Sequence, residues 1–232
     1  TGTLTQDKIQ LVKYTDVFGQ PSQKVLLHAY LNSFYQTGIK NPMDDAVLQY
    51  EKMSEDGYVK VDEIPFDFVR RKMSIVVEKN GQRYIITKGA PEDVLHSSKF
   101  YEKDGALVAM DSVAHKAILS QYDAFSRDGY RVLAVAIRKV AVQPHAYVKD
   151  DEIDLEFIGF VAFLDPAKKD VSDVLRDLEK MGIEIKVITG DSELVTEKIC
   201  KDVHLPVKGT LLGYDIDAMP DDALRVAVTK TT

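Results

Sequence analysis

The sequence predicts a mixed fold class, in which an α+β domain with an antiparallel sheet and packed helices is inserted into a truncated α/β domain. Strand-rich segments joined by Asn80-Gly81 and Asp104-Gly105, both typical of hairpin turns, indicate the antiparallel sheet. After about residue 154, strand and helix patterns alternate, as they do in parallel α/β folds. We expect a stub at residues 1–10, the inserted domain at 11–160 and the remaining α/β part at 161–232.

The N-terminal segments predict one strand and two helices. Residues 8–14 read KIQLVKY, and their spaced apolar side chains favour a short strand. From Pro21 onward apolar residues recur at helical spacing, and Gly38 stands where a glycine commonly ends a helix. Residues 43–53 predict a second short helix. The residues that define the first helix are Leu27, Leu31 and Phe34.

The middle of the chain predicts two hairpins, a helix and a further strand. Residues 73–89 form the first hairpin, whose two turn residues need positive φ, and residues 100–110 repeat the pattern. Residues 115–129 predict an amphipathic helix, and residues 130–137 alternate as a strand. In the first hairpin the expected cross-strand pairs are Glu78 with Arg83 and Val77 with Tyr84.

The C-terminal part predicts two strands, each followed by a helix. LEFIGFVAFLD at residues 155–165 and IEIKVIT at residues 183–189 are the expected strands, and GDSELVTEKIC at residues 190–200 is the second helical segment. These strands are too few for a complete α/β domain, so we expect residues 163–232 to be the less stable part. The first helix is indicated by Val171, Val174, Leu175 and Leu178.

Composition excludes several classes of protein. A net charge of -7 argues against nucleic-acid binding, and the single Cys200 excludes an internal disulfide. The longest apolar run, IGFVAFL, is far shorter than the roughly 18 residues needed to span a bilayer. The patterns of a Walker A loop, a GxGxxG turn and an HExxH zinc site do not occur, and the five histidines are scattered, so no metal site is expected.

Two Thr- and Gly-containing motifs are compatible with phosphate binding. ITGDSE places Thr189, Gly190 and Asp191 at a strand end before a helix, where open α/β sheets bind ligands. An ordinary turn capped by Asp191 or Ser192 explains the same residues. The TGT that opens the chain has the same two interpretations. Both alternatives stay open for both motifs.

Two further motifs are compatible with nucleotide binding. In KGAPED, Lys88 ends a strand, Gly89 leaves room for a ligand near the backbone, and Pro91 suits the first turn of a helix. The alternative is a plain connection with a lysine in solvent. FDFVRRKMS combines Phe66 and Phe68 with three cations, which suits a base and a phosphate or, alternatively, a solvated face.

Taken in order, six motifs resemble the cytoplasmic signature set of P-type cation-transporting ATPases. They are TGTLT, FDFVRRKMS, KGAPE, GYRVLAVA, FLDPAKK and ITGDSELV, and the resemblance covers essentially the whole chain. NSFYQTGIKNPMDDAVL and GDSELVTEKIC look most like the bacterial and archaeal magnesium-transporting members. The resemblance implies a nucleotide-binding domain at residues 11–160, inserted into parts of a Rossmann-like, haloacid-dehalogenase-like phosphorylation domain at 1–10 and 161–232.

The resemblance also implies a nucleotide site. Phe66 matches the aromatic residue that stacks on adenine, and Arg71 matches a cation near the nucleotide, usually a lysine in the family. Lys88 and Gly89 match the adenosine pocket. Two further matches are Arg131, which would reach toward the phosphates, and Asp44, where many members have a glutamate near the adenine edge.

A second group of matched residues belongs to phosphoryl transfer. Thr1, Thr3, Thr189, Gly190 and Asp191 match positions that lie near the phosphate or steady the transferred group. In the hinge motif, usually DPP, Asp165 is present but the second proline is replaced by Ala167. We expect the phosphorylated aspartate to precede Thr1 and the magnesium carboxylates to follow Thr232, so that the isolated chain neither hydrolyses ATP nor becomes phosphorylated.

The implied function is ATP binding within a pump that couples ATP hydrolysis, through an aspartyl-phosphate, to transport of a cation, with magnesium favoured. The cofactors would be ATP and, in the full-length enzyme, Mg²⁺. The partners would be ATP or ADP and the transmembrane and actuator domains of the same polypeptide, with no nucleic acid and no membrane insertion by this segment. We expect it to be a cytoplasmic portion of an integral plasma-membrane protein. The alternatives are a calcium or proton pump, a soluble haloacid-dehalogenase-like phosphatase and a protein-interaction module.

Overall fold

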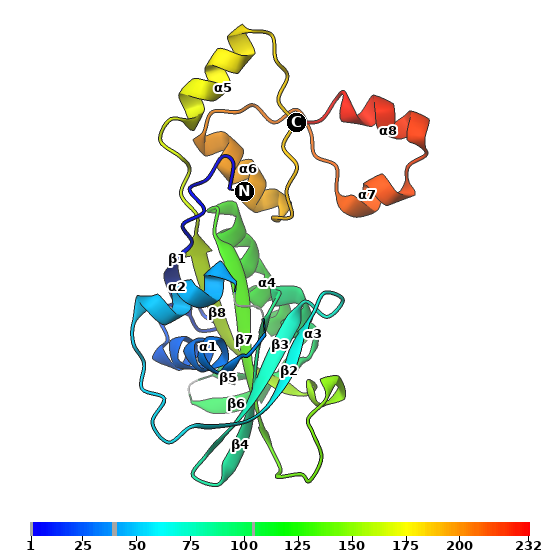
Figure 1. The fold of residues 1–232 in the computed structure, drawn as a ribbon. Coiled ribbons are helices and arrows are strands. Elements are labelled where there is room, and N and C mark those ends of the chain that lie inside the picture. The colour runs from blue at the N-terminus through cyan, green and yellow to red at the C-terminus, as the bar shows by residue number, and fades with distance from the viewer. Residues whose placement is uncertain (1, 39–40, 104) are drawn as a thin grey trace. The chain divides into compact units, whose positions relative to one another are not determined.

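The computed structural model describes residues 2–38, 41–103 and 105–232 (Figure 1). The chain divides into two compact units. The sheet unit comprises residues 9–125 and 132–164, and the helical unit comprises residues 1–8, 126–131 and 165–232.

Among the described residues, eight strands form one sheet in the order β2-β3-β4-β7-β8-β5-β6, with β1 paired to β8. The pairings of β1 with β8, β2 with β3, β3 with β4, β4 with β7 and β5 with β6 are antiparallel, whereas β5 pairs with β8 in parallel. Most of the sheet is thus a set of hairpin-like neighbours, as predicted. The strands are β1 (Gln10–Thr15), β2 (Val59–Asp67), β3 (Lys72–Lys79), β4 (Gln82–Gly89), β5 (Ser98–Lys103), β6 (Ala106–Ala109), β7 (Arg131–Val140) and β8 (Leu155–Leu164).

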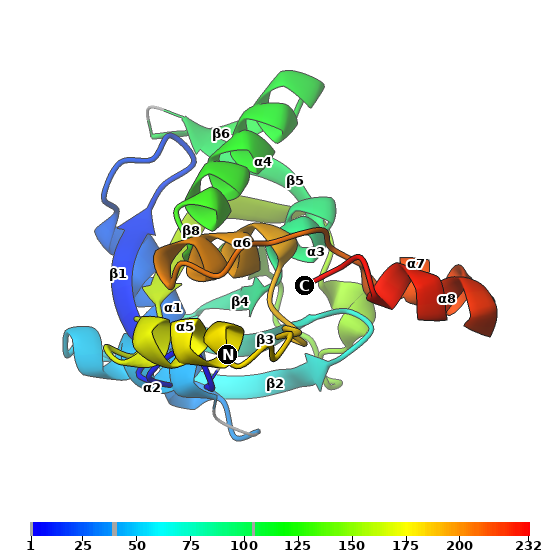
Figure 2. The same cartoon turned by 90° about the horizontal axis from the view of Figure 1, so that it is seen from above.

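Helices cover both faces of this sheet. On one face α1 and α2 lie side by side (Figure 1), and their apolar residues pack against alternate residues of β3, including Met73, Ile75 and Val77. On the opposite face Phe160 of β8 contacts Phe125 of α4, with ring centroids 6.3 Å apart, and Figure 2 shows α2 and α4 on opposite sides of the strands. The helical elements are α1 (Gln23–Tyr35), α2 (Pro42–Tyr50), α3 (Pro91–His96), α4 (Ser112–Arg127) and the 3-10 turn η1 (Lys149–Asp151).

The first predicted hairpin forms in the predicted register. Asn80 and Gly81 have φ values of 51° and 74°, which is the left-handed backbone that the tight turn requires. Glu78 consequently faces Arg83, and Val77 faces Tyr84. In the second hairpin Lys103 pairs with Ala106 across a turn in which Gly105 has a φ of 78°. Asp104, the other predicted turn residue, lies outside the described residues.

The first helix ends earlier than its sequence predicts. Helix α1 begins after Ser22, whose side chain accepts a hydrogen bond from the Val25 amide, and it stops at Tyr35. The next residue, Gln36, is extended, and Lys60 donates to the free carbonyl of Tyr35 at 2.7 Å. Gly38 therefore does not end this helix. Lys60 of β2 provides the hydrogen-bond donor for a carbonyl group of the last turn instead.

The predicted alternation of parallel strands and helices after residue 154 is wrong in two places. β8, at residues 155–164, lies inside the sheet unit, where it is antiparallel to β1 and parallel to β5. Residues 183–189 form no strand among the described residues, and Ile188 is 95% exposed. A strand forms only where a neighbouring strand pairs with its backbone N–H and C=O groups. An apolar, β-branched sequence favours a strand but does not provide that neighbour.

The helical unit has a small core. Val171 and Leu175 of α5 pack with Val203, and Leu4 from the N-terminal segment joins them. The backbone of Thr5 forms an isolated bridge with Ala167. Every side chain of α7 and α8 is at least partly exposed. No helix in the described ranges is both long and apolar enough to cross a membrane. The helices are α5 (Val171–Lys180), α6 (Glu193–Asp202), α7 (Gly213–Ala218) and α8 (Asp221–Val228).

Candidate functional site

A buried ion pair joins β4 to the two helices that cover it. The Lys88 ammonium lies 2.5 Å from a carboxylate oxygen of Asp44 on α2 and 2.5 Å from the hydroxyl of Ser33 on α1. Asp44 also accepts hydrogen bonds from Ser33, at 2.9 Å, and from the Gln36 side chain. The side chains of Lys88 and Asp44 are 4% and 1% exposed, so Lys88 is not a lysine in solvent.

Local sequence explains the position of Asp44. Asn41 caps α2 by accepting hydrogen bonds from the amides of Met43 and Asp44, and Pro42 occupies the first turn. The Asp44 carboxylate in turn accepts a hydrogen bond from the Asn41 amide at 3.3 Å, and the two interactions together form a capping box. One carboxylate thus completes the cap at the start of α2 and neutralises Lys88.

Burial and the partner's charge act in opposite directions on this pair. Burial is the larger influence on Lys88 and places the pKa of its amine below the ordinary value, although Asp44 offsets part of the effect. Burial would raise the pKa of Asp44. The charge of Lys88, together with hydrogen bonds from Lys88, Ser33 and the Asn41 amide, outweighs it and holds the pKa of Asp44 below its ordinary value.

Two phenylalanine rings are exposed where β2 ends and the chain turns toward β3. Phe66 is 52% exposed and Phe68 is 89% exposed, and their rings meet edge to face with centroids 5.2 Å apart. Asp67 shapes the turn between them, because its carboxylate accepts from the amides of Val69, at 2.7 Å, and Arg70, at 3.1 Å. An exposed ring on a shaped turn offers a flat face for stacking a base.

Arg71 and Gly89 lie next to each other at the open end of the β3–β4 pair. Arg71 forms ion pairs with Asp93 of α3, at 2.7 Å, and with Glu92, at 3.8 Å. A Cβ atom added to Gly89 would lie 2.4 Å from the Cβ of Lys72 and 2.5 Å from the Arg71 carbonyl oxygen. Atoms of Arg71 and Lys72 therefore fill the space beside Gly89. Close packing of β3 against β4 requires a residue without a side chain at this position.

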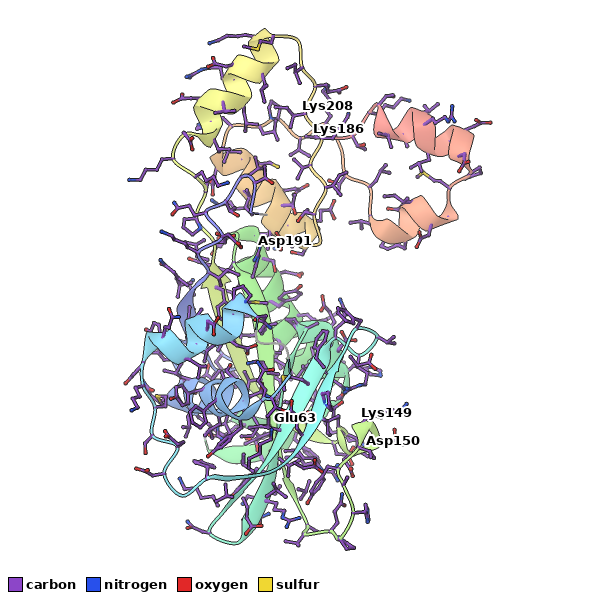
Figure 3. All side chains as sticks on the ribbon, viewed as in Figure 1. Glu63, Lys149, Asp150, Lys186, Asp191 and Lys208 are labelled. Atoms are coloured by element: carbon purple, nitrogen blue, oxygen red, sulfur yellow. The ribbon has the colours of Figure 1, made fainter. Side chains whose placement is uncertain are left out.

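A second cluster of predicted residues lies in the helical unit. Arg131 contacts both carboxylate oxygens of Asp191, at 3.0 and 3.1 Å, and comes within 3.9 Å of Asp165. Thr189 donates to Asp191 at 3.3 Å, and the Asp191 amide donates back to the Thr189 hydroxyl at 3.1 Å. Asp191 stands just before α6, as Figure 3 shows, but the side chain that caps this helix is that of Ser192.

The remaining predicted residues have few contacts. Gly190 is exposed, and no described atom comes within 4 Å of a Cβ built on it. Thr3 is exposed as well, and Thr1 lies outside the described residues. Thr5, by contrast, is buried and donates to Asp165 at 2.7 Å.

Sequence reasoning missed three residues in these clusters. Ser33 and Gln36 complete the network around Asp44, yet nothing in their pattern indicates that Ser33 contacts Lys88 or that Gln36 contacts Asp44. Thr5 belongs to the TGTLT motif, so the signal for it was present.

The described residues do not fit a divalent cation. No group of three or more histidine, cysteine, aspartate or glutamate side chains that could hold a metal ion occurs in the described ranges. The two carboxylates of the helical cluster, Asp165 and Asp191, face Arg131 instead. Hard cations such as Mg²⁺ require several oxygen ligands, so this arrangement suits an arginine pair rather than a metal.

Comparison with known proteins identifies the family. A model described as P-type ATPase, cytoplasmic domain N, matches residues 7–170, which is more than half of the chain. The chain belongs to the P-type ATPase family. The prediction drawn from the six motifs is thereby confirmed.

Individual members of the family match along nearly the whole chain. The proteins named magnesium-transporting ATPase, P-type 1, from Escherichia coli strain K12 and Salmonella typhimurium strain LT2 are 41% identical over 238 residues, covering 100% of this chain and 26% of each relative. Calcium-transporting ATPase 1 from Lactococcus lactis is 32% identical over 257 residues, covering 99% of the chain and 29% of that protein. The chain thus spans about a quarter of the length of these relatives.

Proposed function

We propose that this chain is the ATP-binding cytoplasmic portion of a pump that couples ATP hydrolysis, through an aspartyl-phosphate, to cation transport, with magnesium as the ion. The higher identity to relatives named magnesium-transporting than to the one named calcium-transporting supports the choice of ion. Its partners in the whole protein would be transmembrane and actuator domains of the same polypeptide at the plasma membrane. Measuring the ATP-dependent transport of magnesium, of calcium and of protons by the full-length protein tests the choice of ion.

The geometry that supports nucleotide binding best is the exposed Phe66 ring on its shaped turn. In this proposal Phe66 stacks on adenine, and the Lys88–Asp44 pair lines the adenosine pocket beside Gly89 and Arg71. Stacking on an aromatic face is worth about 1–3 kcal/mol per base elsewhere, so a single exposed ring can carry much of a weak affinity.

The same proposal gives roles to the helical cluster. Arg131 would reach the phosphates, and Thr3, Thr189, Gly190 and Asp191 would steady the transferred group, with Thr1 near it. Residues 11–160 would form the nucleotide-binding domain, and residues 1–10 and 161–232 would be parts of a Rossmann-like, haloacid-dehalogenase-like phosphorylation domain. Phosphoryl transfer depends mainly on positioning and charge neutralisation, and Mg²⁺ bound with ATP supplies part of the latter.

Calorimetric titration with ATP tests the proposal. We expect a dissociation constant on the order of 0.1–1 mM for the chain, with ADP binding nearly as well. Phe66→Ala should weaken binding by about 1–3 kcal/mol. Phe18→Ala is the matched control, because Phe18 is 54% exposed and also meets another ring, Tyr101, edge to face.

The control variant should bind ATP as the unchanged chain does. Equal affinity of folded Phe66→Ala and of the unchanged chain would refute the stacking role. A chain that binds neither nucleotide would favour the protein-interaction alternative. Acyl-phosphate formed from labelled ATP would contradict the expectation that the isolated chain is inactive.

A further inference from the structure

We propose that Arg70 and Glu152 form a clamp that fixes the turn carrying Phe66, and that both are positioning residues for base stacking. The inference rests on the proposed nucleotide-binding function and adds two residues that the motif comparison did not assign. The turn in question is residues 65–71, called the aromatic turn below.

Arg70 ties the two ends of the aromatic turn together. One guanidinium nitrogen, Nη2, donates to the carbonyl oxygen of Pro65 at 2.7 Å, and the other, Nη1, donates to the carboxylate of Glu152. The Pro65 carbonyl directly precedes Phe66, so the contact fixes the backbone from which that ring projects. A planar guanidinium can hold two acceptors at once in a set geometry, whereas an ammonium is a single point charge.

Glu152 is a rigid anchor for this arginine. Its side chain is fully buried, and its second oxygen accepts from the Ser74 hydroxyl on β3 at 2.6 Å. Ser74 in turn lies 2.7 Å from the Thr87 hydroxyl on β4, and Lys72 comes within 4.0 Å of the carboxylate. Glu152 follows directly after η1, which Lys149 and Asp150 mark in Figure 3. The carboxylate is thereby fixed to the β3–β4 pair at the cross-strand pair Ser74 and Thr87.

The part of the aromatic turn around Phe66 has few other contacts with the rest of the fold. Its apolar side chains face solvent, with Phe68 and Val69 each 89% exposed, so burial contributes little to its conformation. The polar contacts of Asp67 shape the turn internally, and Arg71 holds its C-terminal end through Asp93 and the Ala90 amide. Arg70 links the start of the turn, next to Phe66, to the buried Glu152. Without Arg70 the segment that carries Phe66 would have to be ordered by the nucleotide itself, and ordering a segment on binding reduces affinity.

The test compares Arg70→Met and Arg70→Lys with a matched control, Arg83→Met. Arg83 also pairs with a glutamate on the same sheet, its side chain is 17% exposed against 19% for Arg70, and it lies at the opposite end of the β3–β4 pair. We expect Arg70→Met to weaken ATP binding about tenfold and to speed amide exchange in residues 66–71. Arg83→Met should leave both unchanged.

Arg70→Lys separates positioning from general stability. A lysine keeps the charge beside Glu152, but its donors all leave one nitrogen and do not reproduce the fixed spacing by which Nη1 and Nη2 hold Glu152 and the Pro65 carbonyl. The unfolding midpoint should therefore stay close to that of the unchanged chain while ATP affinity falls. A double-mutant cycle gives the second discriminating measurement. In a Phe66→Ala background, Arg70→Met should have no further effect on affinity, because there is no ring left to position.

The outcomes distinguish the two proposals. If Phe66→Ala weakens ATP binding while both Arg70 variants bind as the unchanged chain does, the clamp is wrong and the nucleotide site stands. If Arg70→Met weakens binding equally with and without Phe66, the arginine acts on something other than the ring, and the clamp is again wrong. If the unchanged chain binds no ATP, both proposals fail together.

Discussion

Replacing Gly89 by alanine tests whether this glycine is required by packing between strands. The added Cβ would lie 2.4 Å from the Cβ of Lys72, 2.5 Å from the carbonyl oxygen of Arg71 and 2.6 Å from the Lys72 Cα. Ordinary contacts between carbon atoms are about 3.5–4.0 Å, so β3 and β4 would have to separate by more than about 1 Å at this end. Two of the three atoms belong to the backbone, which cannot rotate away as a long side chain can.

The expected cost follows from these distances. Overpacking of this kind costs about 1–3 kcal/mol. The separation would also stretch the hydrogen bond from the Ala90 amide to the Arg71 carbonyl, now 2.9 Å, which is worth about 1 kcal/mol. We therefore expect a loss of about 2–4 kcal/mol in the free energy of unfolding. For a unit of this size that corresponds to a fall of about 5–15 °C in the midpoint of thermal unfolding.

Gly38→Ala is the control within the same unit. A Cβ at that position would meet only the Glu63 side chain, at 3.9 Å, which is an ordinary contact, so its effect should be small. Thermal and denaturant unfolding of both variants, with amide exchange along β3 and β4, measures the difference. A Gly89→Ala chain as stable as the unchanged one, but with weakened ATP binding, would refute the packing argument and favour a role for this glycine in ligand access.

Three further results are expected. The stability advantage of the unchanged chain over Asp44→Asn should be constant from pH 7 to about pH 5 and should shrink as the pH falls through the depressed pKa of Asp44. The reason is that a carboxylate with a lowered folded-state pKa stabilises the fold only while it is ionised. Denaturant titrations at several pH values measure this difference in stability, and a difference that grows in acid would contradict the expectation. Lys88→Met should lower the free energy of unfolding by about 3–5 kcal/mol, since it leaves Asp44 buried without its counter-ion, and adding Asp44→Asn should recover much of that loss. If the losses of the two single variants simply add in the double variant, the pair is not coupled. Amide exchange should be faster in α7 and α8 than in β3 and β4, because these helices bury little apolar surface, and the reverse ranking would overturn our account of the helical unit.

Features set by short stretches of sequence were predictable. The Asn80-Gly81 turn fixes the register of its hairpin, because few other residues accept the left-handed backbone that both turn positions need. The amphipathic pattern at residues 115–129 gave α4 to within a few residues, with Ile118 buried on its inner face.

Features set by distant partners were not predictable in this way. The burial of Lys88 depends on Ser33 and Asp44, which come from two other elements. Residues 183–189 have the composition of a strand, yet whether a strand forms depends on a paired neighbour and not on that composition. The clamp is a similar case, because Arg70 and Glu152 are 82 residues apart, and the motif that contains Arg70 gives no sign of Glu152 as its partner.

The position of β8 has a consequence for the time course of biosynthesis. β8 lies between β7 and β5 in the sheet and also pairs with β1, which was made about 140 residues earlier. At typical rates of translation, of about 5–20 residues per second, β1 therefore waits about 7–30 s for its partner to emerge from the ribosome. β5 and β7, which are made later in that interval, expose unpaired edges until β8 arrives, and such edges are the surfaces at which nascent chains aggregate or recruit chaperones. The sheet unit thus closes late, in a step governed by the arrival of one strand near its C-terminal end.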